Sequence, residues 1–254
     1  MITVAKVPTC IGSMGRNRGC EKAPDEILNQ LETVYYSESG KKPKIRTIKI
    51  SVNENNPEET MNNISKSEAD IYLGGDHSIT YSAFRTMKSK DAGLIVFDAH
   101  PDLDSTTGTP THEDYLRKLV EEKSINPENI ILIGTRNYGD NELEFIKENR
   151  IKNFTARQIF EYGMRDIADS VTEIANRFKQ MYLSVDIDVV DPSSAPGTGF
   201  PEPEGLQARE VLYLIQRIKL LKNLKKADIV EVNPEKDVNG MTSRLAARIL
   251  MELL

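Results

Sequence analysis

The sequence predicts an α/β protein built on a mainly parallel sheet with helices on both faces. Short runs of β-branched and aliphatic residues alternate along the chain with stretches whose apolar residues recur at helical spacing. This alternation is typical of crossover units, which place helices over both faces of a parallel sheet. One domain over residues 1–254 is expected, because no linker, repeat or low-complexity tract divides the chain.

The expected strands are runs apolar enough to be buried on both sides of the sheet. They are Ile45–Val52, Asp70–Leu73, Gly93–Phe97, Asn129–Ile133, Met181–Val185 and Ala227–Val232.

Three segments, one before the first of these strands and two between later ones, are expected to be helical. A helix over Ala23–Val34 is expected, because a proline and two acidic residues near its start suit the first turn. Apolar side chains have helical spacing over Ile167–Phe178 and Val211–Ile218. The polar segments Ser51–Asn63 and Ser105–Thr111 are expected to be loops.

The overall composition argues against several classes of protein. Hydrophobic residues make up 39% and charged residues 28%, a balance typical of globular chains. The net charge of -6 gives no general basic surface for nucleic acid, which is therefore not an expected partner. No run of about 18 apolar residues indicates a membrane span, and Met1–Cys20 lacks the pattern of a signal peptide, so a cytoplasmic protein is expected. Cys10 and Cys20 are expected to be free thiols.

Three motifs place His and Asp directly after expected strands. They are Gly-Gly-Asp-His-Ser at 74–78, Asp-Ala-His-Pro-Asp-Leu-Asp at 98–104 and Ser-Val-Asp-Ile-Asp-Val-Val-Asp-Pro at 184–192. The carboxyl ends of parallel strands meet at one edge of a sheet, where open α/β folds bind their ligands. All the histidines of the chain lie within or just after these motifs: His77, His100 and His112. The motifs are therefore expected to converge.

The spacing within the motifs supports a shared site. Asp98, His100 and Asp102 alternate, as do Asp186 and Asp188, so in an extended conformation each set projects to one side. Alone, an Asp-x-Asp is more typical of a turn or a helix cap, and a lone histidine is often a packed one. Several carboxylates and two histidines in one place would repel one another unless a cation compensated them, so a metal site is predicted.

The residue types also limit which metal ion the site is expected to bind. Carboxylates with some imidazole suit Mn²⁺ or Mg²⁺, whereas structural zinc more often has cysteine ligands. The candidate ligands are too many for one ion with an open position, yet they fit two ions that share carboxylates. They are His77, Asp98, His100, Asp102, Asp186 and Asp188. Two Mn²⁺ ions are therefore predicted.

These motifs resemble those of the ureohydrolase family of arginases, agmatinases and formimidoylglutamases. The third motif is the most specific, because it continues through Ala-Pro-Gly-Thr-Gly at 195–199 to Pro-Glu-Pro at 201–203 and Gly205. The resemblance extends from Gly12 to Glu-Val-Asn-Pro at 231–234, most of the chain. It implies a three-layer α/β/α sandwich around a mainly parallel sheet of about eight strands, and a homo-oligomer, either a trimer or a hexamer.

The resemblance implies a ligand set for each metal. One ion would take His77, Asp98, Asp102 and Asp186, and the other Asp98, His100, Asp186 and Asp188. Asp98 and Asp186 would then bridge the ions. The pair would lower the pKa of a shared water enough to supply a hydroxide that attacks a guanidinium carbon, with release of urea and an amine.

Three further roles follow from the resemblance. Asp102 would also hold the nucleophile through a hydrogen bond, His112 would relay protons to the leaving amine, and Glu231 would pair with the substrate guanidinium. Without the resemblance, Glu231 is equally well an exposed glutamate at a strand end, and His112 an exposed loop residue.

Agmatine, cleaved to putrescine and urea, is the expected substrate. The interval from Asp98 to His112 is short, as in agmatinases, and Asp104 stands where arginases tend to have an Asn that helps to bind the substrate carboxylate. An acidic side chain there would repel a carboxylate and suit a cationic tail, although Asp104 is equally well a cap of the next turn.

Two departures from the family pattern leave other activities open. Glu113 and Glu204, both expected near the pocket, stand where the family usually has Gly. The alternatives are an arginase, a formimidoylglutamase, a guanidinobutyrase or a metal-binding homologue without activity. A deacetylase on a related fold, which would cleave an amide, is a further alternative.

Overall fold

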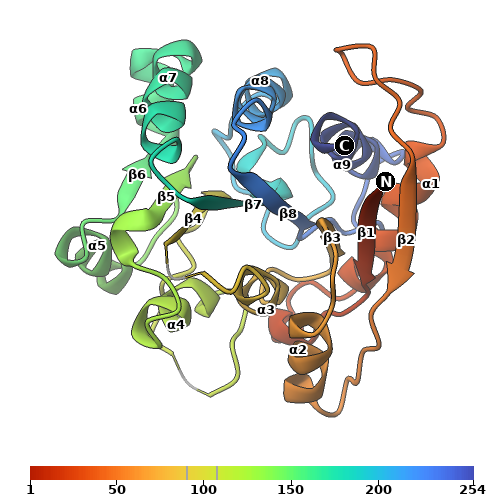
Figure 1. The fold of residues 1–254 in the computed structure, drawn as a ribbon, viewed down its shortest axis with the longest axis horizontal. Helices are drawn as coiled ribbons and strands as arrows, with labels where there is room; N and C mark the ends of the chain where they lie inside the picture. Colours follow the sequence, from red (N-terminus) through yellow and green to blue (C-terminus); the bar gives the residue numbers. More distant parts are fainter. Residues whose placement is uncertain (90, 107) are drawn as a thin grey trace.

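One sheet of eight parallel strands runs through the centre of the molecule (Figure 1). The structure is a computed structural model that describes residues 1–89, 91–106 and 108–254. The strand order is β2-β1-β3-β8-β7-β4-β5-β6. The strands are β1 (Ile2–Val7), β2 (Ile45–Lys49), β3 (Ile71–Gly74), β4 (Ala92–Phe97), β5 (Ile130–Ile133), β6 (Lys152–Phe154), β7 (Gln180–Asp186) and β8 (Leu224–Val230).

Helices cover both faces of this sheet, so the predicted three-layer α/β/α sandwich is confirmed (Figure 1). One face carries α1 (Ala23–Leu31), α6 (Ala156–Tyr162), α7 (Met164–Ala175), α8 (Ala208–Lys219) and α9 (Met241–Leu253). The other carries α2 (Pro57–Ser65), α3 (Ile79–Arg85), α4 (Tyr115–Glu121) and α5 (Asp140–Glu148). None of the described helices is long and apolar enough to cross a membrane.

The central strand β4 shows how the sheet separates two hydrophobic cores. Ile95 and Phe97 pack into the core under α1 and α6–α9, whereas Leu94 and Val96 pack into the core under α2–α5. Successive side chains of a strand point to opposite faces, so a strand covered on both sides must be apolar throughout. Each such side chain contributes about 1.5–3 kcal/mol when it is fully buried.

The sequence-based elements differ from the structure in three ways. The strands β1 and β6 were not expected. The expected strands Ile45–Val52 and Ala227–Val232 end earlier, at Lys49 and Val230, and the expected helices Ala23–Val34 and Ile167–Phe178 end at Leu31 and Ala175. Part of the expected Ser51–Asn63 loop is helical, because α2 begins at Pro57. The described residues of Ser105–Thr111 lie in no helix or strand, and Thr107 lies outside the described residues.

The start of α2 has a clear physical cause. The Asn56 side chain accepts a hydrogen bond of 3.2 Å from the backbone N–H of Glu59, which satisfies one of the unpaired donors of the first turn. Pro57 occupies that turn, where its missing N–H is not needed, and Glu58 and Glu59 face the positive end of the helix dipole. The same polar residues that suggested a loop therefore begin a helix.

Both cysteines are free thiols, as expected. Burial, together with the nearby carboxylate of Glu21, raises the pKa of Cys10 to about 12. The Cys20 thiol is buried, and burial raises its pKa further. Neither is therefore a ready thiolate near neutral pH.

Candidate metal centre

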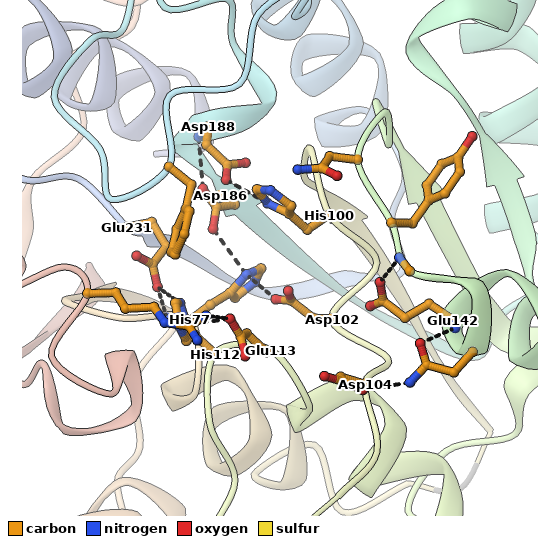
Figure 2. Close-up of a pocket in the computed structure, with 16 residues that line it drawn as sticks. His77, His100, Asp102, Asp104, His112, Glu113, Glu142, Asp186, Asp188 and Glu231 are labelled. Carbon is orange, nitrogen blue, oxygen red and sulfur yellow. Dashed lines mark hydrogen bonds and ion pairs between the residues drawn. The ribbon is translucent and has the colours of Figure 1, made fainter.

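The centre lies where four adjacent strands, β3, β8, β7 and β4, end. Asp98 follows β4 directly, Asp186 is the last residue of β7, and Glu231 follows β8. His77 comes three residues after Gly74, the last residue of β3. Because these strands are parallel and adjacent, their carboxyl ends deliver side chains from four distant parts of the chain to one place (Figure 2).

Two groups of Asp and His side chains have the spacing of metal ligands. The first is His77, Asp98 and Asp186, the second is Asp98, His100 and Asp188, and the ligand atoms within each lie within 4.8 Å of one another. Asp98 belongs to both groups.

The imidazoles in both groups present their Nδ1 atoms to carboxylates. His77 Nδ1 lies 3.0 Å from Asp98 Oδ2, 3.0 Å from Asp102 Oδ2 and 3.2 Å from Asp186 Oδ2. His100 Nδ1 lies 3.0 Å from Asp188 Oδ2 and 3.5 Å from Asp98 Oδ1. The structure therefore brings together all six side chains that the sequence indicated as ligands.

Two unpaired atoms show that the centre fits cations. His77 Nδ1 and Asp98 Oδ2 are buried and, among the described residues, have no hydrogen-bond partner. Buried polar atoms are rarely left without a partner, since the loss of solvation costs about 1–3 kcal/mol for each atom. A divalent cation would be the partner of both atoms, and one near each group would use the five side chains of the two groups, with Asp102 beside the first.

Without cations, three of the crowded carboxylates, those of Asp102, Asp186 and Asp188, hold protons more tightly than usual, whereas the nearby histidines lower the pKa of Asp98. Burial and the charge of Asp98 raise the pKa of Asp102 to about 8. Burial, followed by the charges of Asp188 and Asp98, raises the pKa of Asp186 well above its ordinary value. Burial alone would lower the pKa of His100, but the charges and hydrogen bonds of Asp188 and Asp98 together outweigh it and raise that pKa. Metal binding and proton binding therefore compete.

We expect pH to act oppositely on the metal-free and metal-loaded proteins. A carboxyl whose pKa is raised by folding stabilises the fold fully below its unfolded pKa, about 4. That stabilisation is lost as the pH rises through about 8, the folded pKa of Asp102. In chelator, the melting temperature of the wild type should fall relative to Asp102→Asn between these values. The increase in melting temperature that added Mn²⁺ causes should become larger as the pH rises over the same range.

Calorimetry from pH 4 to 8, with chelator and with Mn²⁺, measures both trends. If the difference in melting temperature between the wild type and Asp102→Asn in chelator does not change with pH, Asp102 does not retain its proton.

The backbone of the centre departs from the expected extended conformation. Asp102 has a φ of 54° and Glu231 a φ of 64°, in the left-handed region that non-glycine residues rarely adopt. Asp188 lies in a 3₁₀ turn, Ile187–Val189. At the start of this turn the Asp188 backbone N–H donates a hydrogen bond of 2.8 Å to Asp186 Oδ1. The interpretation of alternating side chains on extended strands is therefore wrong, because turns bring Asp102 and Asp188 into the centre. Such strained positions are common at functional sites.

A hydrogen-bonded network that sequence reasoning missed lies behind His77. His77 Nε2 is 2.8 Å from Ser184 Oγ and 3.0 Å from the Tyr115 hydroxyl. Ser184 donates to Asp228 Oδ1 at 2.6 Å, and Thr80 and Tyr182 donate to Asp228 Oδ2. An ionised Asp228 only accepts hydrogen bonds, so Ser184 must donate to it and accept the Nε2–H of His77. With its proton on Nε2, the His77 imidazole keeps the lone pair of Nδ1 free to bind a metal ion.

We expect Asp228→Asn to weaken metal binding by about 10–100-fold, since groups that orient a metal-ligating histidine have effects of that size. The side-chain amide of the new Asn can donate a hydrogen bond to Ser184 Oγ. Ser184 then no longer has to accept a hydrogen bond from His77 Nε2. Calorimetric titration with Mn²⁺ measures the affinity, and circular dichroism checks the fold. Wild-type affinity in a folded variant would show that Asp228 does not orient His77.

Glu231 and His112 form a second buried unit beside the metal ligands. Glu231 is only 3% exposed and His112 only 5%, so the alternatives of an exposed glutamate and an exposed loop histidine are both wrong. The Glu231 carboxylate accepts hydrogen bonds of 2.6 Å from the His77 backbone N–H and from the Asn17 side chain. His112 Nδ1 lies 3.5 Å from Glu231 Oε1. Burial alone would lower the pKa of His112, but Glu231 outweighs it and raises this pKa to about 9.

A cavity of about 410 Å³ opens above the centre (Figure 2). Its lining includes predicted site residues together with residues that the motifs did not indicate. The latter are Arg16, Asn137, Tyr138, Gly139, Asn141, Glu142 and Phe200.

The three acidic residues singled out for substrate choice have different positions. Asp104 lines the cavity and accepts a hydrogen bond of 2.6 Å from the Asn141 side chain. Glu113 also lines the cavity. Glu204 is not among the described residues that line the cavity. Glu204 has a φ of 62°, a backbone conformation that glycine adopts more easily than other residues, and the family usually has a glycine at this position.

Comparison with known proteins agrees with this geometry. The model of the arginase family matches residues 1–254. Proclavaminate amidinohydrolase of Streptomyces clavuligerus is 37% identical over 75% of this chain, and the match spans 62% of that relative's length. Arginase of Staphylococcus aureus is 32% identical over 79% of this chain and 72% of its own.

Solved structures show the same similarity. The structure of the Streptomyces amidinohydrolase has a TM-score of 0.89 at 28% identity and covers 99% of this chain and 89% of its own. That of a hypothetical agmatinase from Burkholderia thailandensis has a TM-score of 0.88 at 27% identity and covers 99% of this chain and 84% of its own. Given its fold, its motifs and these matches, the chain belongs to the arginase family.

Proposed function

We propose that this protein uses two Mn²⁺ ions to hydrolyse a guanidino compound to urea and an amine, and that the compound is agmatine. The observation that carries the proposal is a pair of candidate metal groups sharing Asp98, at the base of a cavity that also holds the Glu231–His112 unit. The relatives named as arginase and as an amidinohydrolase support the same class of reaction.

The ligand sets proposed for the ions are those implied by the motifs. His77, Asp98, Asp102 and Asp186 would hold one ion, and Asp98, His100, Asp186 and Asp188 the other. The shared place of Asp98 supports its bridging role, whereas the bridging role of Asp186 stays a prediction. When bound, the ions supply Lewis acidity that makes water a nucleophile near neutral pH. Mn²⁺ is favoured over softer metals by the excess of carboxylate ligands.

The other side chains of the site orient the substrate and move protons. The His77 backbone N–H and the Asn17 amide fix the Glu231 carboxylate, which can accept N–H groups of a guanidinium. His112 Nε2 is buried and, in the described part of the chain, has no hydrogen-bond partner. It is free to give a proton to a leaving amine. Asp102 lies at the metal centre within the cavity, where it can hold an attacking water by a hydrogen bond.

The choice of agmatine depends on the outer cavity. Asp104 is exposed there and can accept a hydrogen bond from the terminal ammonium group of agmatine. Arginine also carries an ammonium group, but its carboxylate would lie near the same acidic side chain. Arginase, formimidoylglutamase and guanidinobutyrase activities remain the alternatives, and the homo-oligomer and the cytoplasmic location stay predictions.

Urea release tests this proposal. The protein, loaded with Mn²⁺, is assayed against agmatine, arginine, 4-guanidinobutyrate and formimidoylglutamate, with urea and formamide measured separately. The highest kcat/KM is expected for agmatine. A higher value for another compound would replace agmatine as the substrate, and no product from any of them in a metal-loaded protein would indicate a metal-binding homologue without activity.

A further inference from the structure

An ion pair at the mouth of the cavity takes no part in the metal groups or the Glu231–His112 unit. Arg16 Nη1 contacts Glu113 Oε1, and both side chains line the cavity. Arg16 is the one lysine or arginine among the described residues of that lining. Glu113, with its dashed contact, lies beside His112 in Figure 2. Because Glu113 compensates the charge of Arg16, a substrate that enters the cavity meets no free positive charge at Arg16.

The backbone holds both partners close to the reacting groups. Arg16 precedes Asn17, which is fully buried and hydrogen-bonded to Glu231, so its side chain extends from a fixed point. Glu113 follows buried His112, and its Oε1 lies 4.0 Å from His112 Nε2. Because Arg16 and Glu113 line the same cavity as Glu231, a substrate whose guanidinium contacts Glu231 can bring its far end near this pair.

The remaining charged groups of the outer cavity are acidic. The Glu142 carboxylate accepts backbone N–H groups of Leu103 at 3.0 Å and Gly139 at 2.8 Å, so its hydrogen bonds are used within the fold. Asp104 is exposed and bound only partly, by Asn141 and its neighbour Ser105. An ammonium tail thus has an acceptor, whereas a carboxylate tail finds only Arg16, whose charge is already compensated.

We propose that Glu113 determines substrate specificity: by pairing with Arg16 it withholds the one lysine or arginine of the described cavity lining from guanidino compounds whose tail ends in a carboxylate. The inference rests on the proposed function and extends it from the reaction to the class of tail. The ion pair is partly exposed, so it adds little stability. Its effect on specificity comes from the sign of the charge that the tail meets.

Removing the Glu113 charge should therefore change the preference between two substrates of similar length. In Glu113→Gln, kcat/KM for 4-guanidinobutyrate relative to agmatine should rise by about tenfold, because one unit of charge near the tail is worth about 1.4 kcal/mol or more at short range. Arg16→Gln should shift the ratio the other way, since it leaves Glu113 uncompensated. In the double variant the gain for 4-guanidinobutyrate should disappear.

A matched control is available on a nearby surface. Glu235 forms an exposed ion pair with Lys22 and does not line the cavity among its described residues. Glu235→Gln removes the same charge from the protein and should leave the ratio unchanged. A shift in this control equal to that of Glu113→Gln would assign the effect to net charge and overturn the proposal.

Binding without turnover separates this inference from the proposed reaction. The product amines putrescine and 4-aminobutyrate carry the same tails as the two substrates, and calorimetry gives their Kd values. The ratio of these values should move with each variant in the direction expected for kcat/KM. If the wild type releases no urea, the proposed function fails, and the Kd ratios still test Glu113. Unchanged ratios in Glu113→Gln and Arg16→Gln, or a gain that persists in the double variant, would overturn the role of the pair.

Discussion

Replacing Asp98 with Asn is expected to abolish the binding of both metal ions and to reduce urea release to background. Asp98 is the residue shared by the two candidate groups, with Oδ2 at 3.0 Å from His77 Nδ1 and Oδ1 at 3.5 Å from His100 Nδ1. An amide keeps the shape but loses the charge that compensates two cations. Turnover should fall by at least about 10⁴-fold, since enzymes commonly accelerate their reactions by 10⁶-fold or more.

Metal content after dialysis against Mn²⁺, measured by mass spectrometry, and the urea assay together test this expectation. Asp104→Asn is the matched control: the same change in the same cavity, at a residue outside both groups, should keep two ions. Two bound Mn²⁺ ions in Asp98→Asn would show that Asp98 does not link the sites, and Asp186, the other bridge implied by the motifs, would then be the residue to replace.

The fold was largely predictable because its central strands are buried on both sides. Strands such as β4 and β5 are apolar throughout, and they are flanked by amphipathic helices, so local pattern and tertiary position agree. β6 has only three residues, none of them fully buried, and β1 contains Thr3 and Lys6, so neither gives this signal. α2 was missed for another reason, because Asn and Pro suit a helix start as well as a loop.

The candidate ligands were predictable because each follows a strand in a dense motif, but their supporting residues were not. Asn17 holds Glu231 across 214 positions of sequence, and Ser184 links His77 to Asp228. Each of these contacts exists only once the sheet has formed, and no local spacing indicates it. A single signal was available: Asp228 is an acidic residue between the apolar residues Ala227 and Ile229 of its strand, and a buried charge requires partners.

The second large effect is expected for His112→Ala, which should keep both metal ions and slow turnover by roughly 10²–10⁴-fold, the usual contribution of a proton-transfer group. His112 belongs to neither metal group, and its Nε2 has no hydrogen-bond partner among the described residues. Metal analysis, steady-state rates and added imidazole test the role together. Imidazole that occupies the vacated space should restore part of the rate, because it replaces the proton donor. Full activity in His112→Ala would remove His112 from the mechanism, whereas loss of the ions would show that it supports the centre instead.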